Sequence, residues 1–332
     1  MRRSFFVIVL AAAACGGKQK STTPPPPLPE PKAEAKPEPP KEEAKAEEKP
    51  QAPQGPIDLT VAAPKVTVKL VTAGKGKKVP LKILAKTGTK QQVELAIDFR
   101  GKSTGLGAPD QEDVFPTFVL TGEAEVKTVD KEGNAEYLLT VTNTDARDVT
   151  GQKFSNEQAK EVAAGLMGLT VTGTINANGS SSDMKLRIEK PGVASVGALG
   201  FMTVAFPALP VLPKEKVGVG AKWQVSSTVK VAEQLDVTQT TDYELVSHKG
   251  NTWTIKGTTK VAGPDQMLGG LKATKINGAG AIDATLVEGT LYPTMKSNVQ
   301  TAFTVSGTDP DTQKTVEGTL DLKQSAAITP KS

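Results

Sequence analysis

The chain contains very few of the residues on which most catalytic and metal sites depend. Its 332 residues include one cysteine, Cys15, and one histidine, His248. A lone cysteine excludes an intramolecular disulfide. A Ser-His-Asp triad or a zinc site would have to be built on His248, which lies in the predicted turn SHKGN. No pair of carboxylates stands out as an acid–base pair. We therefore expect a protein that is not an enzyme and that needs no metal or cofactor.

Aromatic residues are also scarce, at 4% of the chain, and neither sign of charge dominates. Residues 57–332 carry 31 lysine and arginine residues against 29 aspartate and glutamate residues. This near-balance gives no reason to expect nucleic acid or another polyanion as a partner. The N-terminal apolar run, residues 5–10 (FFVIVL), is too short to cross a bilayer core, which takes about 20 residues in a helix.

The N-terminus nevertheless has the parts of an export signal. Arg2 and Arg3 precede the apolar run, and small residues lead to Cys15 and Gly16 in the sequence AAACG. This stretch resembles the lipobox of bacterial lipoproteins. The resemblance implies a signal peptide over residues 1–14, lipidation of Cys15 at the new N-terminus (residues 15–17), and, because Gly16 is not aspartate, sorting to the outer membrane. The alternative is an ordinary signal peptide with Cys15 just inside the mature chain.

Residues 18–56 differ in composition from everything that follows. They hold 12 of the 24 prolines and no aromatic residue, and Leu28 is their only large aliphatic residue. Such a segment cannot bury enough apolar surface to offset the entropy of ordering, so it predicts an unfolded tether. Seven lysines balance seven glutamates in it, which does not favour binding to nucleic acid. The tether acts either as a spacer alone or also as a ligand for a proline-binding partner.

Residues 57–332 alternate between apolar and polar side chains, as in residues 93–99 (VELAIDF) and residues 223–231 (WQVSSTVKV). Alternation of this kind predicts half-buried strands. The turn sequences around Gly133 and Gly250 align with one another and suggest an internal repeat. We expect a mainly β fold with one or two short helices, in which two tandem antiparallel units (residues 57–192 and 214–332) form curved sheets or half-barrels around an apolar core.

Two segments interrupt the strand pattern. Ser155 and Gln158 form a capping-box pair ahead of apolar residues at helical spacing, which predicts a helix over residues 155–168. Residues 193–213 join the two units, and residues 193–212 carry no charge. Because glycines and prolines interrupt them, a buried helix with an extended crossover is favoured over a transmembrane helix. The join forms either a lid over an apolar ligand or plain core.

The join also carries a family likeness. Phe206, Pro207, Leu209 and Pro210, followed by VGVGAKW up to Trp223, resemble an FPxLP…VxVGxxW signature of uncharacterised Gram-negative lipoproteins. More distantly, the arrangement is similar to the half-barrels of the Lol lipoprotein carriers. The resemblance implies a curved sheet that wraps helices around an apolar cavity, and it carries over no catalytic residue. The predicted apolar cavity or core consists of Phe201, Met202, Phe206 and Trp223.

These observations predict a non-enzymatic, lipid-anchored lipoprotein of the outer membrane, with its folded part in the periplasm or at the cell surface. Its β domain would bind an apolar ligand such as a lipid, or an envelope protein. The alternative is a purely structural or scaffolding lipoprotein on the same anchor. An enzyme that uses carboxylates alone is a third hypothesis.

Overall fold

The structure, a computed structural model, describes residues 52–105, 110–205, 209–231, 234–308, 313 and 315–331. The predicted signal peptide, Cys15, the tether up to residue 51 and Phe206 lie outside these residues. So does the side chain of Phe201, although its backbone belongs to a helix.

Most of the described chain belongs to one antiparallel sheet of 15 strands. Thirteen of them follow one another in the order β1-β9-β8-β7-β6-β4-β17-β16-β15-β13-β12-β11-β2, while β5 pairs with β4 and β14 with β15. A separate two-stranded sheet pairs β3 with β10. The strands are β1 (Ile57–Val61), β2 (Val66–Thr72), β3 (Lys75–Pro80), β4 (Lys90–Gly105), β5 (Gln111–Val114), β6 (Thr117–Val129), β7 (Ala135–Arg147), β8 (Thr170–Ile175), β9 (Met184–Ile188), β10 (Lys216–Val219), β11 (Lys222–Val231), β12 (Leu235–Lys249), β13 (Thr252–Ala262), β14 (Gln266–Leu268), β15 (Leu271–Val287), β16 (Thr294–Thr308) and β17 (Thr315–Lys331).

The alternation in sequence becomes two chemically different faces of the sheet. In β13, Trp253, Ile255 and Val261 are buried, while Lys256 and Lys260 between them are exposed. Successive side chains of a strand point to opposite faces, so the apolar set collects on one side and the charged set on the other. The two stretches whose alternation predicted strands lie in β4 and β11.

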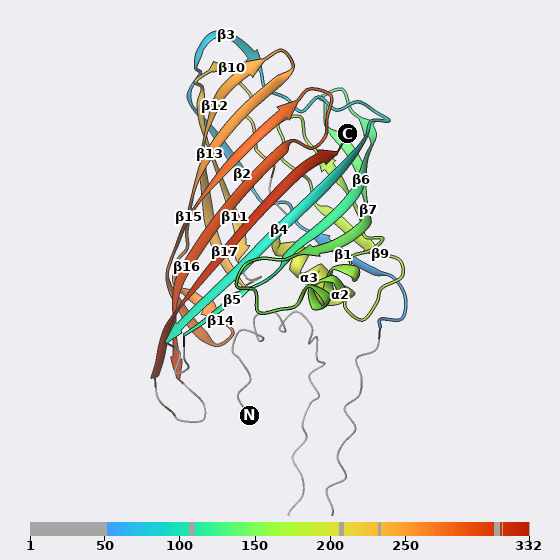
Figure 1. The fold of residues 1–332 in the computed structure, drawn as a ribbon. Helices are drawn as coiled ribbons and strands as arrows, with labels where there is room; N and C mark the ends of the chain where they lie inside the picture. The colour runs from blue at the N-terminus through green and yellow to red at the C-terminus, as the bar shows by residue number, and fades with distance from the viewer. Residues whose placement is uncertain are drawn as a thin grey trace, which may run out of the picture.

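The large sheet curls until its two edges come close together. β1 and β2 stand at opposite ends of the strand order, yet only residues 62–65 join them in sequence. A connection of that length spans about 17 Å at most. The 13-strand path therefore bends back on itself, as the tilted, wrapped strands of Figure 1 show. The prediction of a mainly β fold with two short helices and curved antiparallel sheets is confirmed.

The two predicted units contribute to this single sheet and exchange strands. β4 of the first and β17 of the second pair over 14 residues, from Gln92 opposite Lys331 to Gly105 opposite Gly318. β2 and β3, which come early in the chain, pair with β11 and β10 of the second unit. The sheet is thus continuous across the predicted boundary between the units.

Glycines in β15 permit the sharp curvature. A Cβ atom at Gly278 or Gly280 would overlap a carbonyl oxygen of β16, so no larger residue fits without a shift of the backbone. A bulge lies just before them, where Lys275 has a positive φ of 54°. Bulges and glycines of this kind bend sheets.

Two helices lie near one end of the sheet, while β3 and β10 lie at the other (Figure 1). α2 (Asn156–Ala164) begins with the predicted capping box: the Gln158 N–H donates to the Ser155 Oγ, and the Ser155 N–H donates to the Gln158 Oε1. It ends at Ala164, earlier than predicted, because the N–H groups of Leu166 and Met167 donate to carbonyl oxygens three residues before them instead of four. Gly165 packs against the start of α3 (Ser195–Ala205). Neither helix is long and apolar enough to cross a membrane.

Candidate ligand-binding cavity

α3 packs against the concave face of the sheet and is apolar on all sides. Ala198, Leu199 and Met202 are buried and belong to the main apolar cluster, together with inward residues of both halves of the sheet. Val193 and Val196 near its start are 55% and 40% exposed. A helix without a polar face is normally buried on every side. The start of this segment is instead partly exposed, so the segment is more apolar than its degree of burial would lead one to expect.

The chain after α3 continues to cover the interior. Leu212 is buried, and its N–H donates to the carbonyl oxygen of Asn178 at 2.7 Å. Val211 accepts a hydrogen bond of 2.8 Å from the indole Nε1 of Trp223. The predicted helix within the join is confirmed, and the described residues 209–213 after it form no helix or strand.

The structure describes the side chains of two of the four predicted site residues and places both in the main apolar cluster. Met202 is buried in α3, and Trp223 is completely buried at the start of β11. The ring that stacks on Trp223 is Tyr243, with 5.5 Å between centroids and 17° between planes. The predicted core grouped Trp223 with residues of the join and did not include Tyr243. Trp223 and Tyr243 lie directly opposite one another where β11 pairs with β12. Aligning these two alternating strands in the sequence could have suggested the contact.

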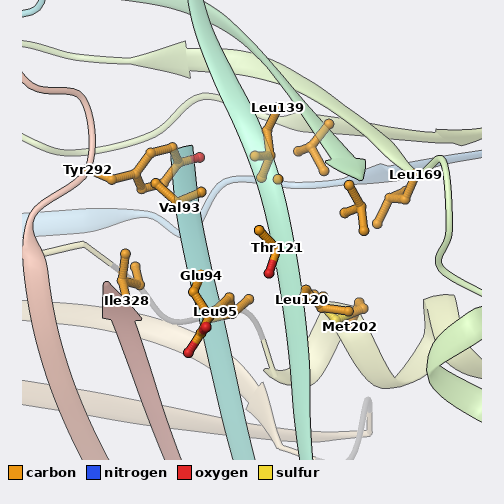
Figure 2. Close-up of a pocket in the computed structure, with 13 residues that line it drawn as sticks. Val93, Glu94, Leu95, Leu120, Thr121, Leu139, Leu169, Met202, Tyr292 and Ile328 are labelled. Carbon is orange, nitrogen blue, oxygen red and sulfur yellow. The ribbon is translucent and has the colours of Figure 1, made fainter. Parts of the chain in front are cut away.

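A small cavity lies between α3 and the first half of the sheet, as Figure 2 shows. Its volume is about 30 Å³. Met202 of α3 lines it on one side, and Tyr292 closes it on another. The remaining lining comes from β4, β6, β7, β8, β17 and the residue just before β8: Val93, Glu94, Leu95, Leu120, Thr121, Gly122, Leu139, Val141, Leu169, Val171 and Ile328. Its walls are almost entirely apolar, and pockets for small-molecule ligands typically measure about 300–1,000 Å³. The cavity as it stands is therefore a packing defect at the helix–sheet interface.

A buried glutamine holds the loop that carries Tyr292. The Gln91 Oε1 accepts hydrogen bonds from the N–H groups of Leu291 and Tyr292, at 3.1 and 2.9 Å, and its Nε2 donates to the carbonyl oxygen of Tyr292 at 2.9 Å. The side-chain amide thus satisfies three backbone groups that the core would otherwise leave unpaired. The sequence patterns described above do not single out Gln91. The alternation in β4 could have revealed that Gln91 is buried, because it shares a face of the strand with Val93 and Leu95.

Tyr292 carries a polar hydroxyl group and lies in the apolar wall of the cavity. Its hydroxyl is buried and has no hydrogen-bond partner of good geometry among the described residues. Its ring meets that of Tyr137 edge-on, with 6.2 Å between centroids. Burial raises the pKa of the Tyr292 hydroxyl well above its ordinary value, and the neighbouring Tyr137 raises it further. Tyr292 therefore stays neutral, and its hydroxyl interacts with that of Tyr137.

Residues 206–304 match a family of unknown function (DUF6263). The match begins at Phe206 in the join and reaches Thr304 in β16, less than a third of the chain. It includes Trp223 and Tyr292 and leaves out β4, β6 and β17, which supply much of the cavity wall. No curated protein gives a significant match to the chain.

Proposed function

We propose that this protein is a non-enzymatic, lipid-anchored lipoprotein of the outer membrane whose curved sheet binds an apolar ligand of the lipid class beneath α3. The observation that carries the proposal is the uncharged cover over the concave face. α3 and the residues after it are apolar, and an apolar cavity marks the place where helix and sheet fit poorly. In this proposal Cys15 holds the lipid anchor.

Binding requires α3 to move, because a cavity of about 30 Å³ cannot hold an acyl chain. Moving α3 would expose Ala198, Leu199 and Met202, whose burial contributes on the order of 4–7 kcal/mol. An acyl chain gains about 0.8 kcal/mol for each methylene that it buries, so ten methylenes gain about 8 kcal/mol. An acyl chain of about ten or more methylenes could therefore replace the helix without a net loss of free energy, whereas a shorter acyl chain could not.

Native mass spectrometry of the full chain, followed by organic extraction, tests the proposal. Extraction separates a bound lipid from the acyl groups attached to Cys15, which stay with the protein. We expect lipid to be released in near-stoichiometric amount from the wild-type chain. We expect Met202→Trp, which fills the cavity, to lower that amount.

The matched control is Met267→Trp, the same substitution at a residue of β14 that is 61% exposed. It should leave the bound lipid unchanged. Absence of lipid from the wild-type chain, or equal amounts in the wild type and Met202→Trp, would contradict binding beneath α3.

A second candidate function is that of a structural lipoprotein that positions an envelope partner. The observation that favours it is the packed interior, in which Trp223, Met295 and Leu291 are almost completely buried and the space beneath α3 is small. This candidate predicts no co-purified lipid and a partner protein that can be cross-linked to the intact chain in cells.

A further inference from the structure

The stretch of chain that contains β2 and β3 has a concentration of positive charge. Seven lysines and no aspartate or glutamate occur from residue 65 to residue 86. In the part of the chain that the structure describes, none of these lysines forms an ion pair. Three of them, Lys75, Lys77 and Lys78, lie in β3, far from α2 and α3 (Figure 1). The near-zero net charge of the folded part conceals this local excess.

A pocket of about 400 Å³ lies among these residues, between the β3–β10 sheet and the end of β12. Lys75 and Lys77 line one side and His248 lines another, while Val219, which is 44% exposed, supplies apolar surface and the buried Val217 and Leu245 lie behind it. No carboxylate is among the lining residues. The volume falls within the range of small-molecule pockets.

The walls of the pocket are fixed by backbone contacts. The N–H of Gly218 donates to the carbonyl oxygen of Ala73 at 2.9 Å, and the N–H of Gly220 donates to that of Leu245 at 2.8 Å. The two strands approach so closely at Gly74 and Gly218 that a Cβ on either would overlap the opposite backbone. The floor is rigid as well, because Val217 and Leu245 are almost completely buried.

The histidine of the pocket is also held in place. Its ring stacks on Trp253 with 3.6 Å between centroids and 3° between planes, and its Nε2 bonds to the carbonyl oxygen of Gly250 at 2.9 Å. Because a carbonyl oxygen only accepts, the Nε2 carries the proton. The Nδ1 does not take part in that bond.

We infer that this pocket binds a phosphate or phosphate-ester group, from a lipid headgroup or from a small soluble ligand. Two unpaired lysines supply two positive charges, and a dianionic phosphate balances both, whereas a carboxylate would leave one unbalanced. The nearest acidic residue on β12, Glu244, is already paired with Lys222 at 3.5 Å. A phosphate alone would leave part of the volume empty, and the exposed side chain of Val219 suits the carbon part of an ester.

The test uses the full chain with Cys15→Ser, so that no lipid anchor inserts into vesicles. Inorganic phosphate is titrated calorimetrically, and co-sedimentation is measured with phosphatidylcholine vesicles that contain or lack phosphatidic acid. Binding only to the vesicles with phosphatidic acid identifies a lipid headgroup, and calorimetric binding of phosphate identifies a soluble ligand. If neither probe binds, the inference is wrong.

The double variant Lys75→Gln/Lys77→Gln should weaken whichever binding is seen by at least about tenfold, because each lysine loses a charge-assisted hydrogen bond. Lys260→Gln/Lys323→Gln is the matched control, since both residues are exposed lysines of the large sheet away from the pocket. It should bind like the parent chain. Equal weakening in both double variants would show attraction by overall charge and would overturn the site.

Discussion

Gln91→Leu should be among the most destabilising single substitutions of this protein. Leucine has a similar size and fits an apolar environment, so the change removes hydrogen bonds while it alters packing very little. The Leu291 and Tyr292 N–H groups and the Tyr292 carbonyl oxygen would each lose their partner inside the core. An unpaired buried polar group costs about 1–3 kcal/mol.

Three such groups give about 3–5 kcal/mol of lost unfolding free energy once some relaxation of the loop is allowed. That is a large fraction of the roughly 5–15 kcal/mol that holds a typical domain together. Urea denaturation of the full chain, followed by tryptophan fluorescence, measures the loss as a shift of the midpoint.

Gln92→Leu provides the control on the next residue of the same strand. The Gln92 side chain is exposed, and its Nε2 donates to the Glu123 Oε2 at the surface, at 3.1 Å. The control should cost less than about 0.5 kcal/mol. If Gln91→Leu came within about 1 kcal/mol of Gln92→Leu, the three hydrogen bonds would not be what fixes the Tyr292 loop.

Three further substitutions probe the core and the ion pairs. Trp223→Phe should lower the unfolding free energy by about 1–2 kcal/mol more than Trp253→Phe in urea denaturation, because only the Trp223 indole has a hydrogen-bond partner among the described residues. Ser195→Ala removes the hydroxyl that donates to the Gly165 carbonyl oxygen at 2.8 Å and should speed hydrogen exchange in α3. Burial raises the pKa of Glu94, but hydrogen bonds from two basic side chains outweigh it and hold the pKa below its ordinary value. The stability advantage of the wild type over Glu94→Gln should therefore be present near neutral pH and disappear as the pH falls below about 4.

Local patterns in the sequence predicted the elements of the fold well. The alternation in β4 and β11 correctly predicted strands, and Ser155 with Gln158 correctly predicted the start of α2. Such patterns work because a strand with one buried face must repeat every two residues, and a helix end must satisfy its free N–H groups. The end of α2 was predicted too late, because the turns after Ala164 form hydrogen bonds over three residues instead of four, a change that the apolar spacing does not reveal.

Pairing between distant strands could not be predicted in the same way. Alternation tells which side chains face inward but does not name the neighbouring strand. Nothing in β2 indicates that it leaves the first unit to pair with β11, and nothing in β17 indicates β4 as its neighbour. The candidate sites depend on these pairings, since the pocket with Lys75 and His248 exists only because β3 crosses to β10.

The place where the sheet can open follows from its hydrogen bonds. Separating β4 from β17 would break a ladder of 14 residue pairs. β1 and β2 share no ladder among the described residues, and at their junction the Ala63 N–H donates to the Asp183 Oδ1 at 2.9 Å. Opening at this seam therefore sacrifices the fewest bonds. The seam adjoins β9, which leads directly into the segment that ends in α3. If α3 moves to admit a ligand as proposed, this seam is the place where the sheet can widen while the long central strands stay paired.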